Sequence, residues 1–147
     1  ALSNKTGKTV YYITPNGEHS SYLKPMKRKI VSKIEININT LDNIFKDVEH
    51  IDFLKLDTQG SEYDILLGAE ETLKKTVEVK CEVEYSEEYS NQKLEEDVTE
   101  LMESYDFYKR NEQDRSSNHS DVIYGRKENY PDEWVMENGK WRNKNEK

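Results

Sequence analysis

Residues 50–69 read HIDFLKLDTQGSEYDILLGA and hold the clearest structural pattern of the chain. An apolar strand pattern over residues 51–56 ends in Asp57, passes through a glycine and turns directly into an amphipathic helix pattern. In open α/β sheets, ligands bind outside the carboxyl ends of the strands, where the connecting loops form a crevice. The layout therefore predicts a ligand site that includes Asp57, Gln59 and Glu62.

The order of elements on both sides of this stretch indicates an α/β fold. Ser61 can cap the helix that follows it, and Thr40 can cap a short helix before it. Strand patterns cover residues 9–14, 34–38, 51–56, 77–85, 107–108 and 121–125, and helix patterns cover residues 41–45, 61–75 and 94–105. This order predicts a mostly parallel sheet that ends in an antiparallel C-terminal hairpin.

The strand pattern over residues 77–85 alternates between apolar and polar side chains, and its polar face includes Glu82 and Glu84. If this strand pairs beside the strand that ends in Asp57, one of these glutamates approaches the same crevice. A central parallel strand is normally apolar on both faces, so the alternation needs an explanation. Either one face of the sheet is poorly covered, or the glutamates line a cavity.

Asp57 has two competing interpretations. A carboxylate at the end of a buried strand can hold a hydroxyl or amine group, orient a cationic cofactor or act as a base. Alternatively, Asp57 and Glu62 only cap the following helix, because helix N-termini favour acidic side chains. Gln59 offers an amide donor and acceptor, and Gly60 supplies a backbone angle that other residues resist.

Other catalytic and metal-binding motifs are missing from the sequence. The three histidines have no metal-ligand spacing, so we expect surface histidines and no metal site. Cys81 lies in an apolar stripe and is expected in the core. None of the six glycines forms a G-x-G-x-x-G turn, so the chain has no obvious nucleotide cradle.

The composition fits one domain and excludes several kinds of partner. The chain has 147 residues, of which 35% are charged, and its net charge of -8 argues against nucleic acid. The basic patch over residues 24–33 is interpreted as a solvated loop. A single cysteine rules out an internal disulfide and suits a reducing cytoplasm, and no apolar run is long enough to cross a membrane. We therefore expect a cytoplasmic protein.

The central motif and its flanks resemble the FkbM family of S-adenosylmethionine-dependent methyltransferases. The family pattern has a leucine-aspartate pair before a short helix and then reads approximately iDllKiD-x-(E/Q)-G-x-E-x-x-(I/V)-L-x-G-A. The matching residues here are Leu41, Asp42, Ile51, Asp52, Leu54, Lys55, Asp57, Gln59, Gly60, Glu62, Leu66, Gly68 and Ala69. Further likeness lies in Ala1-Leu2-Ser3 with Gly7, in His19-Ser20-Ser21-Tyr22-Leu23, in Glu82-Val83-Glu84-Tyr85 with Tyr89, and in Asp121-Val122-Ile123-Tyr124.

This resemblance implies a partial Rossmann-like sheet of the class I methyltransferase type. The family's glycine-rich turn and the acidic residue that holds the cofactor ribose are expected upstream of Ala1. Residues 1–127 would then be the C-terminal portion of a methyltransferase domain, and residues 128–147 a polar tail. We expect this chain to bind S-adenosylmethionine weakly or not at all. We also expect it to self-associate through an open apolar edge formed by Phe53, Leu54 and Leu56.

The same resemblance assigns roles to the site residues. Asp57, Glu62 and Glu82 would face the methyl-transfer site, and Asp57, Gln59 and Gly60 would contact the cofactor. The acceptor would be a hydroxyl oxygen of a small molecule or sugar. Two alternatives stay open at this point: a non-catalytic α/β module for binding or oligomerisation, and a carboxylate-based metal enzyme that uses Asp57, Glu62 and Glu82.

Overall fold

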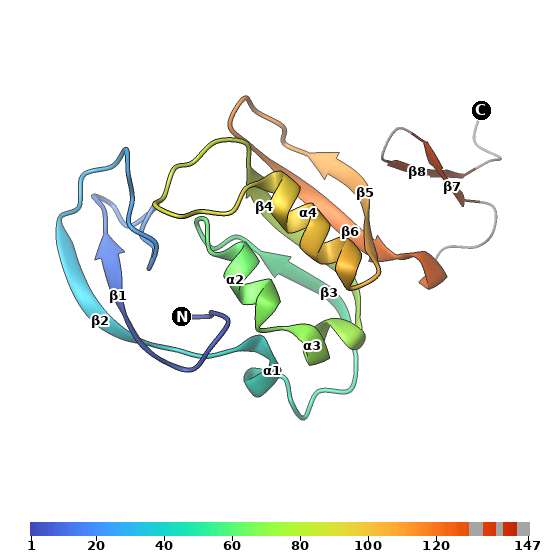
Figure 1. Cartoon of the computed structure of the whole chain (residues 1–147), viewed down its shortest axis with the longest axis horizontal. Helices are drawn as coiled ribbons and strands as arrows, with labels where there is room; N and C mark the ends of the chain where they lie inside the picture. Colours follow the sequence, from blue (N-terminus) through green and yellow to red (C-terminus); the bar gives the residue numbers. More distant parts are fainter. Residues whose placement is uncertain (130–133, 138–139, 144–147) are drawn as a thin grey trace.

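Four strands form the central sheet of the computed structural model, which describes residues 1–129, 134–137 and 140–143 (Figure 1). In spatial order they are β3 (Ile51–Leu56), β4 (Thr76–Glu84), β6 (His119–Arg126) and β5 (Phe107–Gln113). Strands β3 and β4 pair in parallel, whereas β6 pairs antiparallel with both of its neighbours. The mixed α/β architecture and the C-terminal hairpin are therefore confirmed.

The prediction of a mostly parallel sheet is wrong for the strand pairs. Strand β6 lies between β4 and β5, so two of the three neighbouring pairs are antiparallel. Because β6 runs against both neighbours, β3, β4 and β5 still point in one direction. Their carboxyl ends consequently meet at the same edge of the sheet.

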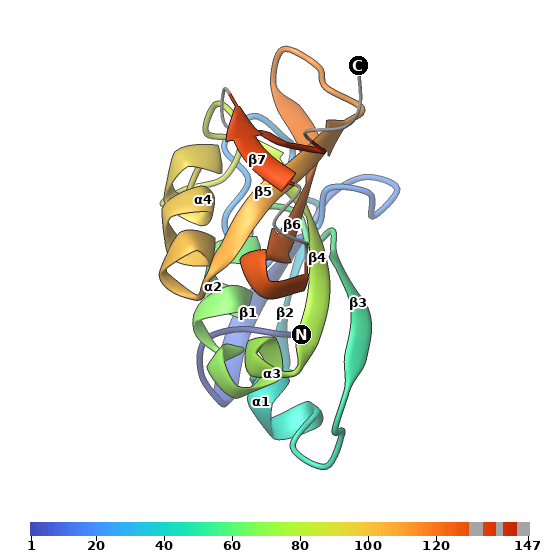
Figure 2. The ribbon, with the colours of Figure 1, turned by 90° about the vertical axis from the view of Figure 1, so that its right-hand side faces the viewer.

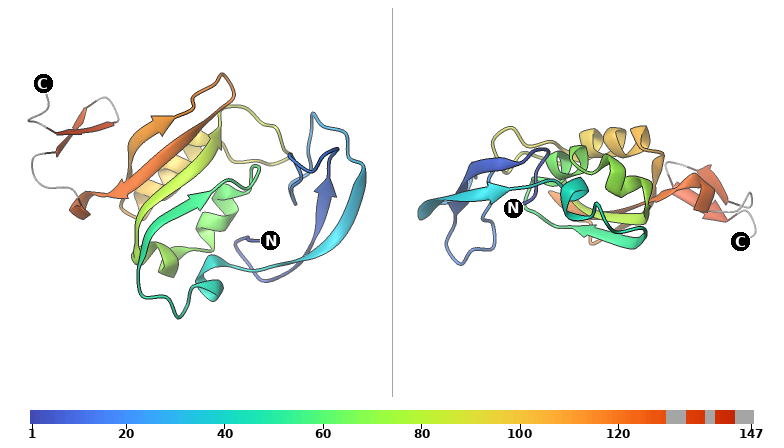
Figure 3. Two further views of the ribbon diagram at one scale, coloured as in Figure 1. Left: turned by 180° about the vertical axis from the view of Figure 1, so that it is seen from behind. Right: turned by 90° about the horizontal axis from the view of Figure 1, so that it is seen from below.

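Three helices cover one face of this sheet, as Figures 2 and 3 show. They are α2 (Glu62–Leu67), α3 (Glu70–Lys74) and α4 (Glu95–Ser104). Between the helices and the sheet lies one apolar core, made by Leu41, Leu54, Leu56, Ile65, Leu66, Ala69, Leu73, Val79, Cys81, Val83, Val98, Met102, Phe107, Val122 and Tyr124. In the described part of the chain, no helix covers the other face.

This one-sided cover explains the alternation of β4. Val79, Cys81 and Val83 face the helices and are at most 1% exposed, while Lys80 and Glu82 on the other face are half-buried. Burying each such apolar side chain contributes roughly 1.5–3 kcal/mol to folding. The prediction that Cys81 is a core residue is confirmed, and burial raises the pKa of its thiol.

The helix expected over residues 61–75 is two helices, because the chain breaks at Gly68 and Ala69. A Cβ atom at Gly68 would lie only 2.5 Å from the carbonyl oxygen of Ser3, so the N-terminal segment packs directly against the helix break. The predicted Ser61 side-chain cap is also wrong. Its hydroxyl donates a hydrogen bond to the Thr58 carbonyl oxygen at 3.0 Å instead of accepting one from the helix.

The short helix α1 (Leu41–Ile44) is confirmed, as is its Thr40 cap, whose hydroxyl accepts from the Asn43 N–H at 3.2 Å. Asp42 in its first turn binds a different helix. Its carboxylate accepts from the N–H groups of Thr72 at 2.7 Å and Glu71 at 3.1 Å, which lie in the first turn of α3. Asp42 therefore caps α3 from outside and joins two separate segments.

Replacing Asp42 with alanine should lower the free energy of unfolding by about 1–2 kcal/mol, because the first turn of α3 loses its hydrogen-bond acceptor. Urea denaturation followed by circular dichroism measures this loss. Asp47→Ala is the control, since Asp47 is exposed and no side-chain hydrogen bond of it is seen among the described residues. Equal effects of the two substitutions would contradict the capping role.

A separate antiparallel sheet consists of β1 (Gly7–Ile13) and β2 (Ser32–Ile38), at the blue end of the chain in Figure 1. Its connecting loop reaches the segment after β4: the Met26 N–H donates to the Glu88 carbonyl oxygen, and the Ser90 N–H donates to that of Lys24. Residues 24–31 of the basic patch thus form a mostly exposed loop whose backbone is docked beside the carboxyl end of β4, and residues 32–33 begin β2.

Strand β3 is an edge strand of the four-stranded sheet. Of the three apolar residues expected to form an open edge, only Phe53 is exposed, at 49%. Leu54 and Leu56 are buried because they point toward the helices. Self-association through this edge stays a prediction.

The C-terminal segment contains a 3₁₀ turn (Lys127–Asn129) and a two-stranded antiparallel sheet of β7 (Trp134–Glu137) and β8 (Lys140–Asn143). The rest of the tail predicted for residues 128–147 lies outside the described residues. Among the described helices, none has the length and apolar character required to span a bilayer.

Candidate functional site

The loop that leaves β3 has an unusual backbone. Both Gln59 (φ 59°) and Gly60 (φ 89°) occupy the left-handed region, which non-glycine residues rarely adopt. Inside the loop, Glu62 is buried, and its Oε1 accepts from the Thr58 N–H at 2.5 Å and from the Thr58 hydroxyl at 2.9 Å. Burial raises the pKa of Glu62. Glu62 thus stabilises the loop before α2, and its catalytic role stays a prediction.

Asp57 and Glu82 lie side by side, because β3 and β4 are parallel with Leu56 opposite Cys81. Their carboxyl groups share a hydrogen bond that lowers the pKa of Asp57. Burial and the neighbouring Asp57 raise the pKa of Glu82 to about 7. Two carboxylates in contact cannot both ionise easily, so near neutral pH the pair holds one proton between them. The expected approach of a β4 glutamate to the Asp57 crevice is confirmed.

Gln59 connects this pair to residues from two distant segments. Its Oε1 accepts from the Tyr89 hydroxyl at 2.9 Å and lies 3.3 Å from His19 Nδ1, and its Nε2 lies 3.5 Å from Asp57 Oδ1. The prediction of surface histidines holds for His50 and His119 but is wrong for His19, which is half-buried. The amide of Gln59 therefore fixes the geometry around Asp57.

A cleft of about 240 Å³ opens beside Glu82 at the carboxyl end of β4. Its lining residues are His19, Arg28, Gln59, Glu82, Glu84, Glu88, Tyr89, Asn118 and His119. Both explanations of the β4 alternation therefore apply: in the described part of the chain one face of the sheet has no helix over it, and two of the glutamates line a cavity. Burial and repulsion from Glu62 and Glu82 raise the pKa of Glu84 to about 8.

A second pocket, of about 330 Å³, borders the same loop. It is lined by Ala1, Leu2, Tyr11, Gly17, Glu18, Ser20, Ser21, Tyr22, Asp57, Thr58, Gln59, Ser61 and Ile65. Gln59 lines both cavities. Asp57 lines the second pocket and is hydrogen-bonded to Glu82, which lines the cleft. Asp57 and Gln59 thus form a partition between two cavities.

Several site residues were not predicted from the sequence. Arg28, Tyr89 and His19 reach the cleft from loops far from the central motif, and Gln92 lies beneath it. Of these residues, only Tyr89 and the segment that contains His19 were noted from the sequence, as parts of the family resemblance. Among the described residues, no three acidic, cysteine or histidine side chains are arranged to hold a metal ion, so nothing in them supports the metal-enzyme alternative.

Glu84 should make the stability of the protein depend on pH. Its pKa is about 8 in the folded chain against 4.5 ordinarily, so the unfolded chain loses this proton first as the pH rises. The protonated Glu84 therefore contributes fully to the free energy of unfolding below about pH 4.5. By about pH 8 a few kcal/mol of this free energy are lost. The negative charges of Glu62, Glu82 and Glu88 raise the pKa of Glu84 further, whereas a hydrogen bond with Gln92 lowers it.

Glu84→Gln tests this dependence through urea denaturation at about pH 5 and about pH 9. The variant should match the unchanged protein at the lower pH and exceed its free energy of unfolding by roughly 1–3 kcal/mol at the higher pH. A parallel pH dependence of both proteins would mean that Glu84 ionises normally.

A family model described as Methyltransferase FkbM domain matches residues 1–108. The match includes the β3 loop, β4 and Tyr89, and ends at the start of β5. Neither the curated proteins nor the solved structures contain a match to this chain. The resemblance of the central motif is therefore confirmed, whereas the likeness noted at residues 121–124 lies outside the matched range.

Proposed function

Because the chain belongs to the FkbM methyltransferase domain family, we propose that it transfers a methyl group from S-adenosylmethionine to a hydroxyl oxygen of a small molecule or sugar. The observation that carries this proposal is the hydrogen-bonded Asp57–Glu82 pair between two cavities. A methyl transferase needs space for two molecules and a proton acceptor at the point where they meet. The partition formed by Asp57 and Gln59 meets this requirement.

The order of the strands supports the finer assignment to the class I methyltransferase fold. The family resemblance implies a doubly wound sheet whose final strand is antiparallel. Here β6 is the only reversed strand of the four-stranded sheet, and it is inserted between β4 and β5. We propose that β3, β4, β5 and β6 correspond to the C-terminal half of such a sheet.

The residues beside the second pocket fit part of the methyl donor. Asp57 offers a carboxylate for a cationic or hydroxyl group, and Gln59 supplies an amide group next to it. When bound, S-adenosylmethionine supplies a methyl group activated by its positive sulfonium. The chain has no glycine-rich turn to cradle a nucleotide, so weak binding by this chain stays a prediction.

The cleft would hold the acceptor, and the carboxyl pair would take its proton. Near neutral pH, Asp57 is the ionised member of the pair and Glu82 carries the shared proton. A hydroxyl group placed against this pair can pass its proton to Asp57 as the oxygen gains its methyl group. Gln59, held by Tyr89 and His19, keeps Asp57 in place. Orientation of this kind supplies roughly 7–11 kcal/mol in well-aligned systems.

The experiment is a methyl-transfer assay with the 147-residue chain and methyl-labelled S-adenosylmethionine. The donor is used at millimolar concentration, because binding is expected to be weak, and hydroxyl-bearing sugars and small alcohols serve as acceptors. We expect S-adenosylhomocysteine to form only when an acceptor is present. A lack of turnover despite measured binding of S-adenosylhomocysteine would favour a non-catalytic module on this scaffold.

A further inference from the structure

The basic patch over residues 24–33 lies at the β1–β2 end of the molecule (Figure 1) and concentrates positive charge in an acidic chain. No acidic residue lies between Glu18 and Glu35. The basic side chains of the patch are Lys24, Lys27, Arg28, Lys29 and Lys33. Because the whole chain has a net charge of -8, the rest of it is strongly negative. The patch is therefore the surface that an anionic partner would meet, while the remainder repels it.

Three lysines of the patch have no carboxylate partner. Lys27 forms an ion pair with Glu88 at 2.7 Å. Lys24, Lys29 and Lys33 are exposed and form no ion pair with any described residue. Their positive charge is therefore available to a partner.

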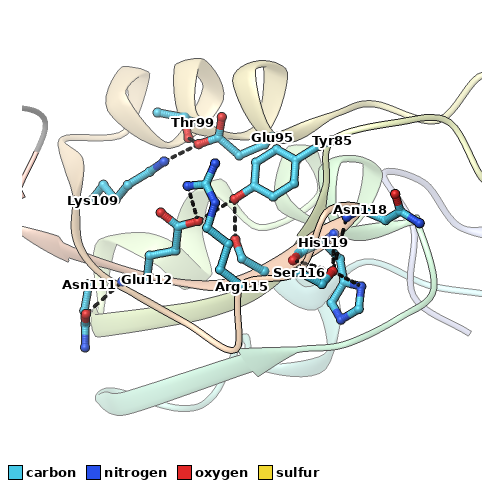
Figure 4. Close-up of polar contacts among 11 residues, drawn as sticks. Tyr85, Glu95, Thr99, Lys109, Asn111, Glu112, Arg115, Ser116, Asn118 and His119 are labelled. Carbon is cyan, nitrogen blue, oxygen red and sulfur yellow. Dashed lines mark hydrogen bonds and ion pairs between the residues drawn. The ribbon is translucent and has the colours of Figure 1, made fainter.

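The basic side chains of the β5–β6 hairpin differ in this respect (Figure 4). There Lys109 pairs with Glu95, and Arg115 Nη1 donates to Glu112 at 2.8 Å. These charges are neutralised within the molecule. The hairpin consequently offers an anion much less than the basic patch does.

Large apolar side chains stand exposed among the lysines of the patch. Met26 is 57% exposed and Val31 is 53% exposed, which makes them the two most exposed large apolar side chains of the described residues. Single exposed apolar residues are common on protein surfaces, whereas larger exposed apolar patches rimmed by polar residues mark interaction sites. The patch thus combines positive charge with aliphatic surface.

Backbone hydrogen bonds hold this exposed loop near both of its ends. The Met26 N–H donates to the Glu88 carbonyl oxygen at 2.9 Å, and the Val31 N–H donates to the Ile13 carbonyl oxygen at 2.8 Å. Because the loop is already ordered, a partner can cover the two aliphatic side chains with little further loss of conformational entropy.

A bilayer surface with anionic lipids matches both properties of the patch. Lysine side chains are attracted to anionic headgroups, and aliphatic side chains enter the boundary between headgroups and acyl chains. Nucleic acid offers phosphates as well, but proteins that bind single strands stack the bases on aromatic side chains. Residues 24–34 contain no aromatic residue. The combination of lysines and aliphatic side chains therefore favours lipid.

We propose that the basic patch docks on a membrane surface rich in anionic lipids, with Met26 and Val31 between the headgroups and the lysines against the lipid phosphates. This role goes beyond the interpretation of the patch as a solvated loop. It also goes beyond the proposed function, because lipid binding needs no methyl transfer. Arg28 of the same patch lines the cleft beside β4, so docking would bring this cleft close to the headgroups.

The test is co-sedimentation of the full chain with vesicles of phosphatidylcholine, either alone or mixed with phosphatidylglycerol. At about 0.1 M salt the chain should bind the anionic vesicles at least tenfold more tightly, and about 1 M salt should remove most of this preference. Equal binding to both vesicles, or binding to neither, overturns the proposal. No S-adenosylmethionine is present, so such a failure leaves the proposed function untouched.

Charge variants identify the surface that binds. Lys24→Gln combined with Lys29→Gln should weaken binding to the anionic vesicles by about tenfold or more. The matched control is Lys5→Gln combined with Lys46→Gln, which removes the same charge at two exposed lysines outside the patch. The control should weaken binding by no more than about twofold, because screening limits the effect of distant charges. Equal losses in the two double variants would reject the patch as the docking surface.

Apolar variants separate lipid from other anions. Met26→Ser combined with Val31→Ser should weaken vesicle binding by about tenfold, whereas Ile44→Ser combined with Val48→Ser, at exposed positions outside the patch, should not. Thermal unfolding checks that each variant is folded. Binding of single-stranded DNA as tight as that of the anionic vesicles, with no effect of the Met26 and Val31 changes, would reject the membrane in favour of nucleic acid.

Discussion

Replacing Gly60 with alanine should lower the free energy of unfolding by roughly 2–5 kcal/mol. Gly60 has a φ of +89°, so an alanine there would have a strained left-handed backbone. Its Cβ would also lie 2.7 Å from Tyr89 Cδ2 and 2.9 Å from Gln92 Nε2. Both neighbours are buried and fixed by hydrogen bonds, so they cannot move away without disturbing the site.

Gly17→Ala is the matched control for this prediction. Gly17 also has a positive φ, of +81°, but a Cβ atom there would meet nothing within 4 Å. The control should therefore lose only about 1–2 kcal/mol from backbone strain. Urea denaturation of both variants measures the difference, which reports the close packing of Gly60. Equal losses of the free energy of unfolding would show that the Tyr89 and Gln92 side chains can move away from the added Cβ at no cost.

Replacing Asp57 with asparagine should lower kcat/KM for methyl transfer by about 100-fold or more. The amide keeps the size of the side chain but cannot accept the proton of the hydroxyl group. The change also removes the negative charge that helps to raise the pKa of Glu82. The residual activity should consequently depend on pH with a midpoint below about 7.

Asp52→Asn serves as the control for Asp57→Asn. Asp52 lies on β3, the strand that ends just before Asp57, and its side chain is 93% exposed, so activity and stability should be unchanged. Measurement of kcat/KM across pH for all three proteins, together with thermal unfolding, separates catalysis from folding. If Asp57→Asn retains its activity within a factor of about ten, then Asp57 is not the proton acceptor.

The sequence predicted the elements that depend on local pattern. Strands β3 and β4 follow from periodicity, and Thr40 caps α1 as its position indicates. The break between α2 and α3 could not be predicted, because it depends on the packing of Gly68 against Ser3, which is remote in the chain. The position of β6 likewise follows from pairing between strands and not from any local pattern.

The candidate site was predictable to a similar degree. The adjacency of Asp57 and Glu82 followed from the pairing of two strands whose patterns were clear. His19 and Tyr89 could not be assigned, because each reaches Gln59 from a loop whose path is set by distant contacts. A pattern of residues reports which face a side chain occupies, but it does not report which loop will fold over it.

The insertion of β6 between β4 and β5 sets the order in which the sheet can close during synthesis. A ribosome releases β3, β4 and β5 before β6, yet β4 and β5 do not pair with each other. Until residues 119–126 emerge, one edge of β4 keeps its backbone N–H and C=O groups unpaired. Of the four strands of this sheet, the last one made therefore closes it. Slow translation before residue 119 would prolong an intermediate that is prone to aggregate.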